Sequence, residues 1–169
     1  MTDIPQIATE RLVLRGYRLE DFDAFAAFYA TARSAFAGGP RDLREAWRHF
    51  AADLGHWAMM GFGWWMVTEN GRPVGTVGMH RPPFCDDIEL GWTLFDGATG
   101  RGLATEAARA ALRWAVATLA PERLISHIDP RNAASVRLAE RLGARRHEGR
   151  AAHDPDACIY LHDLKGFRS

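Results

Sequence analysis

The sequence predicts a single α/β domain, an α+β arrangement in which helices flank a mixed, largely antiparallel central sheet. Several short segments alternate apolar and polar residues at the period of a strand, whereas others repeat apolar residues at helical spacing. The 169 residues, 47% of them hydrophobic, are enough to bury a substantial core. We find no linker, internal repeat or low-complexity segment, so we expect one domain over residues 1–169 in the order β-α-α-β-β-β-α-β-α-β.

The first third of the chain predicts one strand and two helices. Residues 12–14 read Leu-Val-Leu and predict the strand, and residues 20–28 follow as a helix with acidic residues in its first turn. Residues 42–58 predict a second helix with an apolar stripe, which at this spacing is typical of core rather than of a binding site. We expect the buried stripe to contain Leu43, Ala46, Trp47, Phe50, Leu54 and Trp57.

The rest of the chain alternates strands and helices. Strands over 64–67 and 73–79 are predicted to form a hairpin, because Asn70-Gly71 readily adopts the positive φ angles of a tight turn. The later elements are predicted as a strand over 88–94, a helix over 104–119, a strand over 124–128, a helix over 132–142, and a final strand or hairpin around 158–161.

The glycine-rich turn between the 88–94 strand and the following helix is a candidate anion site. Gly97, Gly100 and Gly102 interrupt the strand pattern directly before the helix. A helix that starts from such a turn presents unpaired N–H groups and the positive end of its dipole, which favour a phosphate. Arg101 adds a positive charge. A turn that only joins a strand to a helix fits the same residues equally well.

Composition excludes several function classes. Lys plus Arg and Asp plus Glu each total 21, and this zero net charge argues against a general nucleic-acid binder. Cys85 and Cys158 are too few for a disulfide framework, and no CxxC or HExxH spacing predicts a metal site. No signal peptide is visible, and Arg113 interrupts the most apolar helix, so we expect a cytoplasmic protein that does not enter a membrane.

Common nucleotide and hydrolase motifs are also missing. Residues 100–105 read GRGLAT, which does not satisfy the dinucleotide pattern GxGxxG, and the Gly-Lys-Ser/Thr ending of a P-loop is absent. No serine lies in the GxSxG turn of a serine hydrolase.

Four segments nevertheless resemble one family, the GNAT superfamily of N-acetyltransferases. Residues 88–112 read IELGWTLFDGATGRGLATEAARAAL and resemble its acyl-CoA motif Q/R-x-x-G-x-G/A, with Thr99 in the first position. Residues 129–145 read DPRNAASVRLAERLGAR and resemble the second motif, N-x-x-S before a helix ending in Leu-Gly. Residues 9–25 are similar to the start of the branch that acetylates ribosomal-protein N-termini at alanine or serine, and the hairpin over 69–79 fits the expected strands.

The resemblance implies acetyl-CoA as co-substrate and no metal. Backbone groups of Trp92, Thr93 and Leu94 would bind the pantetheine arm and the thioester carbonyl, and Asn132 would lie near the sulfur end. The pyrophosphate would be cradled by Gly100, Arg101, Gly102, Leu103, Ala104 and Thr105.

Direct attack of an amine on a thioester needs a neutral amine, stabilisation of an oxyanion, and a proton for the departing thiolate. Many family members place a tyrosine acid in the second-motif helix, where this chain has Ala139. Ser135 is the candidate acid, against the alternative of a helical serine bonded to a preceding carbonyl. Glu89 is the candidate base, against the alternative of an outward-facing or ion-paired carboxylate. Further candidate bases are Asp86, Asp87 and His80.

The implied reaction is transfer of an acetyl group from acetyl-CoA to a primary amine. The acceptor is expected to be a peptide N-terminus or a small molecule. Acceptor loops vary most in such families, and residues 32–62 and 80–87 are particular to this chain. The alternative is a non-catalytic acyl-CoA-binding sensor or partner protein on the same fold. Dimers are frequent in such families, and a neutral composition is compatible with a homodimer.

Overall fold

A computed structural model describes residues 3–151 and 154–167 of the chain. Its strands are β1 (Ile7–Ala8), β2 (Val13–Arg15), β3 (Trp64–Glu69), β4 (Arg72–His80), β5 (Ile88–Leu94), β6 (Leu124–Ile128), β7 (Arg145–Ala151) and β8 (Asp154–Leu161). Its helices are α1 (Phe22–Tyr29), α2 (Leu43–Met60), α3 (Leu103–Thr118) and α4 (Ala133–Arg141), with 3-10 turns η1 (Leu19–Asp21), η2 (Ala32–Ala37) and η3 (Lys165–Phe167).

The described strands form one eight-stranded sheet in the order β1-β2-β3-β4-β5-β6-β8-β7. Every neighbouring pair is antiparallel except β5 and β6, which confirms the mixed, largely antiparallel sheet. The last two strands, β7 and β8, form a hairpin, the second of the two predicted alternatives. The two-residue strand β1 was not predicted, because it is too short to show an alternating pattern.

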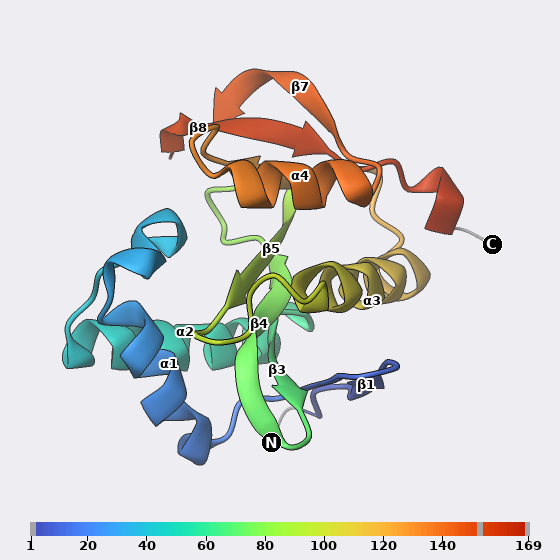
Figure 1. Ribbon diagram of the computed structural model, residues 1–169. Helices are drawn as coiled ribbons and strands as arrows, with labels where there is room; N and C mark the ends of the chain where they lie inside the picture. The colour runs from blue at the N-terminus through green and yellow to red at the C-terminus, as the bar shows by residue number, and fades with distance from the viewer. Residues whose placement is uncertain (1–2, 152–153, 168–169) are drawn as a thin grey trace.

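Helices cover both faces of the central strands (Figure 1). Val77, Leu90 and Leu112 belong to a core that joins one face to α3. Phe25, Phe50 and Met66 belong to a second core between the other face and helices α1 and α2. Among residues 3–151 and 154–167, no helix combines the length and the apolarity that a membrane span requires.

The predicted buried stripe of α2 is partly wrong. Ala46, Phe50 and Trp57 are buried as expected, but Leu43 is 68% exposed and Trp47 is 46% exposed. The polar residues Asp53 and His56 are buried instead. Polar residues therefore occupy part of the inward side of α2, and the spacing of apolar residues does not predict them.

Strands β5 and β6 separate after a short contact, and this separation positions the site. In the described chain they pair only at Ile88 with Leu124 and Glu89 with Ile125. Beyond that point Ser126 Oγ donates a 2.6 Å hydrogen bond to the Leu90 carbonyl and lies 2.9 Å from His162 Nε2. The rest of β5 keeps its β4 partner on one side and faces an opening on the other.

Candidate acetyl-CoA and acceptor site

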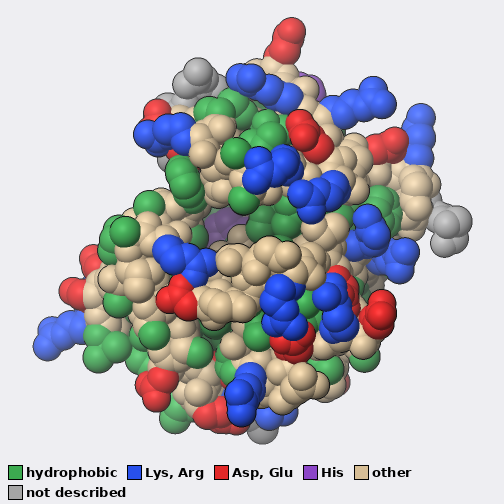
Figure 2. Space-filling model, in the orientation of Figure 1, with side chains coloured by type: hydrophobic (Ala, Val, Ile, Leu, Met, Phe, Trp, Pro, Cys, Tyr) green, Lys and Arg blue, Asp and Glu red, His purple; other side chains and the backbone are tan. Residues whose placement is uncertain are grey.

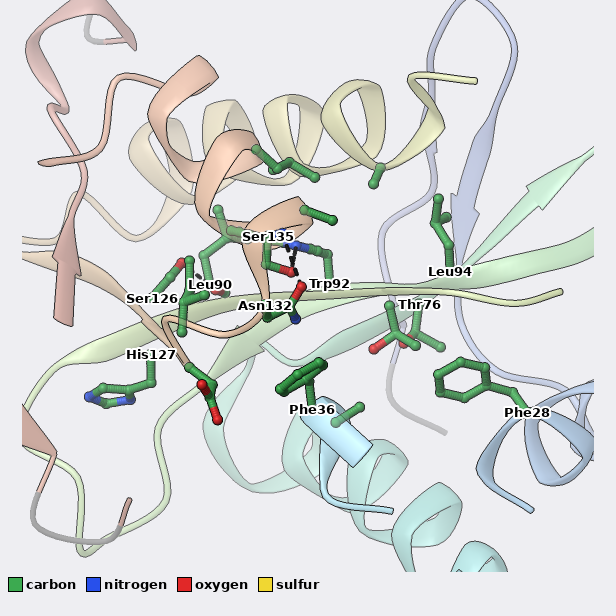
Figure 3. Close-up of a pocket in the computed structure, with 18 of the residues that line it drawn as sticks. Phe28, Phe36, Thr76, Leu90, Trp92, Leu94, Ser126, His127, Asn132 and Ser135 are labelled. Carbon is green, nitrogen blue, oxygen red and sulfur yellow. Dashed lines mark hydrogen bonds between the residues drawn. The ribbon is translucent and has the colours of Figure 1, made fainter. Parts of the chain in front are cut away.

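A cavity of about 430 Å³ occupies the opening between β5 and β6. Figure 2 shows this side of the molecule hollowed between two lobes, with a histidine side chain visible in the hollow. The close-up in Figure 3 shows Trp92, Asn132 and Ser135 on one side and Phe28, Phe36 and Thr76 on the other. The cavity therefore reaches from α4, past β5, to the side covered by α1 and α2.

The backbone of β5 offers hydrogen-bonding groups to this cavity. The Phe95 amide donates to the Val74 carbonyl at 2.9 Å, so Phe95 is bonded to the adjacent β4. Successive residues in an antiparallel ladder alternate between facing the partner and facing away. Accordingly, the backbone groups of Trp92 and Leu94 point into the opening, and those of Thr93 point toward β4. The side chain of Thr93 lines the cavity instead.

The glycine-rich turn reaches α3 in a conformation that suits a close-lying anion. Gly97, Gly100 and Gly102 all have φ between 77° and 79°, the left-handed region that glycine readily adopts. A Cβ on Gly97 or Gly100 would meet nothing within 4 Å, so the outer side of the turn is open. No side chain caps α3 at its N-cap residue, Gly102. The first N–H groups of α3 are therefore available to a phosphate.

The remaining predicted cradle residues contribute in different ways. Ala104 lines the cavity, whereas Gly100, Arg101, Gly102, Leu103 and Thr105 do not. Leu103 is fully buried, so its side chain is not available to a ligand.

Arg101 is an ion-pair partner rather than a free charge at the turn. Its guanidinium donates to both carboxylate oxygens of Glu69 at 2.6 and 2.8 Å, and this contact lowers the pKa of Glu69. Arg11 likewise binds Glu106 at 2.7 Å and donates to the Arg101 carbonyl at 3.0 Å. Two arginines thus face two glutamates around the start of α3, and the Arg101 guanidinium is already paired.

Ser135 is held by the residues predicted to lie beside it. Trp92 Nε1 donates to Ser135 Oγ at 3.2 Å, and the Ser135 amide donates to Asn132 Oδ1 at 3.2 Å (Figure 3). Asn132 is therefore the N-cap of α4, and all three residues line the cavity. Ala139 is 0% exposed and packs in a small core with Ile128 and Tyr160.

Glu89 lines the cavity and is also ion-paired. His127 donates its backbone N–H to Glu89 at 3.3 Å, and His127 Nδ1 lies 2.9 Å from the carboxylate. Of the further candidate bases, Asp87 pairs with Arg123 at 3.3 Å and the His80 ring stacks on His56. Among the described residues, Asp86, Asp87 and His80 do not line the cavity, which leaves Glu89 as the best-placed candidate.

Sequence reasoning missed the polar residues at the α1–α2 end of the cavity. Tyr29, His49 and Asp53 line this end. Burial raises the pKa of Asp53 to about 8 and lowers that of His49 to about 4. The only sequence signal was that His49 and Asp53 are polar positions four residues apart within an amphipathic helix, a spacing that places them on one face.

Comparisons with known proteins show the family to which this chain belongs. The family model for the acetyltransferase (GNAT) domain matches residues 11–145. The solved acetyltransferase from Agrobacterium tumefaciens C58 is 38% identical over 95% of each chain, with a TM-score of 0.90. A Vibrio cholerae protein, provisionally named a ribosomal-protein-serine acetyltransferase, is 25% identical over 95% of this chain and 98% of that chain, with a TM-score of 0.76.

The chain belongs to the GNAT acetyltransferase family, whose reaction is acetyl transfer from acetyl-CoA. In the parts of the chain that the structure describes, no group of three or more His, Cys, Asp or Glu side chains is arranged to hold a metal ion.

Proposed function

We propose that the protein transfers the acetyl group of acetyl-CoA to a primary amine by direct attack. The observation that carries the proposal is the single cavity that passes β5 where β5 leaves β6. The α3–α4 side offers the helix amides and the β5 backbone to CoA. The α1–α2 side offers room for an acceptor, so the two substrates would meet at β5.

In this arrangement the backbone groups of Trp92 and Leu94 hold the pantetheine arm and the thioester carbonyl. The residues over 100–105 hold the pyrophosphate, and Asn132 lies near the sulfur end. A backbone N–H directed at the developing oxyanion contributes about 100- to 1000-fold to the rate in comparable sites. The hydrogen bonds of this cradle would come from backbone N–H groups at the start of α3.

The transfer forms a bond between the amine nitrogen and the carbonyl carbon and breaks the carbon–sulfur bond. Glu89 takes a proton from the amine, directly or through one water, and releases it to solvent after the transfer. Ser135 supplies a proton to the departing thiolate and regains one from water. Support for these roles comes from the position of both side chains on the cavity wall.

The acceptor is proposed to be a peptide N-terminus or a small amine. The name of the Vibrio cholerae relative supports the peptide class, so the assay includes peptides that begin with Ser or Ala. The test is release of CoA thiol from acetyl-CoA against a panel of amines and peptides. Tight CoA binding without turnover on any of them would contradict the enzyme and favour a non-catalytic acyl-CoA sensor. The replacement of the usual tyrosine by Ala139 is the observation that makes this second function worth testing.

A further inference from the structure

We propose that the buried carboxylate of Asp53 binds a protonated amine group of the acceptor at the α1–α2 end of the cavity. This inference rests on the proposed function and assigns a chemical class to its acceptor. Asp53 lines the cavity, yet the acetyl-transfer steps assigned to Glu89 and Ser135 do not use it. A buried ionised carboxylate needs a cation or several hydrogen-bond donors, and the described contacts give Asp53 one hydrogen bond, from Tyr17.

The contacts of Asp53 leave acceptor capacity open. Oδ2 accepts a hydrogen bond from the Tyr17 hydroxyl at 3.0 Å, and Oδ1 lies 3.7 Å from His49 Nε2, beyond hydrogen-bond distance. In the described chain no Lys or Arg forms an ion pair with it. An ionised carboxylate can accept several hydrogen bonds, so Oδ1 has room for a donor from a ligand.

Asp21 is a second buried carboxylate of this chain, and a cation and a backbone N–H satisfy it. Asp21 is 1% exposed, and Arg15 donates to both of its oxygens at 2.7 Å. The Arg18 amide adds a third hydrogen bond at 2.8 Å. Asp21 does not line the cavity among the described residues. Of these two buried carboxylates, the one that lines the cavity is therefore the one without a cationic partner in the described chain.

The walls around Asp53 suit an organic cation. Phe28, Tyr29, Phe36 and Trp64 line the same end of the cavity (Figure 3 shows Phe28 and Phe36). Aromatic faces attract an alkylammonium group through their quadrupole, and more strongly where water is excluded. Phe36 is 52% exposed and belongs to η2, so it stands where a ligand would enter.

Protonation of Asp53 links cation binding to pH. Burial raises the pKa of Asp53 to about 8, so the carboxyl group holds a proton near neutral pH until a cation replaces it. The other titratable or charged groups that face Asp53 or its neighbour His49 are Tyr17, Tyr29, Arg41 and His80. Arg41 acts at longer range, because its guanidinium lies over the Tyr29 ring, 5.8 Å from the centroid. Binding of an ammonium group near pH 7 should therefore release a proton from Asp53.

The first test measures binding without turnover, by calorimetry on the protein saturated with CoA. The probes are (3-aminopropyl)trimethylammonium, its carbon isostere 4,4-dimethylpentylamine, and the neutral alcohol 4,4-dimethylpentanol. We expect at least one ammonium probe to bind about tenfold or more tightly than the alcohol, with a heat at pH 7 that varies with the ionisation enthalpy of the buffer. Asp53→Asn should abolish both the preference and the proton release. No preference in the wild-type protein, or a preference that survives in Asp53→Asn, overturns the proposal.

The probes also identify which ammonium group is held. If Asp53→Asn weakens only the trimethylammonium probe, Asp53 binds a second cation of the acceptor. An equal loss for both amines means that Asp53 binds the amine to be acetylated. Both results support the carboxylate–ammonium contact. A change in melting temperature without a change in either affinity contradicts it.

Turnover provides the second test. Asp53→Asn should raise the KM of a cationic amine by about tenfold or more, with the KM of acetyl-CoA unchanged. Asp21→Asn is the matched control, because it alters a buried carboxylate outside the cavity and should leave the amine KM unchanged. Tyr17→Phe keeps the carboxylate and should keep the cation preference. If no amine is acetylated but cation binding still depends on Asp53, the proposed function fails and this inference stands. If an amine is acetylated but cation binding does not depend on Asp53, only the inference is rejected.

We expect the Asp53→Asn variant to fold. The folded-state pKa of Asp53 lies above its unfolded value of 3.8, so stability is lost as pH rises toward 8. A neutral amide avoids that loss, and the variant should melt at least as high as the wild type at pH 8. Should it fail to fold, Asp53→Ser replaces it in the same measurements.

Discussion

Replacing Ser135 by alanine distinguishes two roles of this side chain, as the hydrogen-bond acceptor of Trp92 and as the general acid. The change removes the acceptor of the 3.2 Å bond from Trp92 Nε1 and leaves that half-buried N–H without its partner. One such bond contributes about 1 kcal/mol to the free energy of unfolding. In a domain of this size, that loss lowers the melting temperature by about 2–4 °C. The hydrogen bond from the residue 135 amide to Asn132 Oδ1 needs only the backbone of residue 135, so the substitution leaves it in place.

The catalytic consequence is far larger if Ser135 supplies the thiolate proton. Removing a general acid lowers kcat by about 100-fold or more, whereas the KM of acetyl-CoA should change little. The assay is steady-state release of CoA thiol at 25 °C, well below either melting temperature. Arg137→Ala, on the exposed side of the same helix, is the control and should change neither quantity. A melting temperature lowered by 2–4 °C (about 1 kcal/mol) with kcat within about twofold of wild type would refute the acid role and leave Ser135 as a partner of Trp92.

Three further predictions follow from the contacts of the described residues. Glu89→Gln should lower kcat by about 100-fold in the same assay, because an amide cannot accept the amine proton; wild-type kcat would reduce Glu89 to an ion-pair partner of His127. Asp21→Asn should lower the free energy of unfolding in urea by about 3 kcal/mol or more, because the buried charge of Arg15 loses its partner, and a loss below about 1 kcal/mol would contradict this. Burial lowers the pKa of His162 from 6.5 to about 4, so stability should fall by up to about 3 kcal/mol as pH decreases from 6.5 to 4. A His162→Gln variant should lose that part of the pH dependence, and an unchanged slope would show that other groups cause it.

The strand–turn–helix around the glycine-rich turn could be predicted because its signals are local. Side chains over 88–94 alternate at the strand period, and those over 104–119 repeat at the helical period. The structure places these elements at Ile88–Leu94 and Leu103–Thr118, within one residue of the prediction. The same locality explains why the two family motifs could be found without coordinates.

The partners of the charged residues could not be predicted in this way. Arg101 meets Glu69, 32 positions away, and Glu89 meets His127, 38 positions away. Such pairs depend on sheet register and on how helices pack, and a pattern within a single element contains no information on either. Asp53 was overlooked for a related reason. It lies in an amphipathic helix, and a stripe of apolar residues does not indicate which polar residues of that helix are buried.

The sequence by itself determined the class of fold, the order of most elements, and the acetyl-CoA-dependent family, because each rests on periodicity or on short motifs within one element. Only the tertiary structure decided where β5 leaves β6, which backbone groups face the gap, and that Asp53 reaches the far end of the same cavity. These features arise when segments distant in the chain meet, and their energies depend on burial and pairing that exist only after folding.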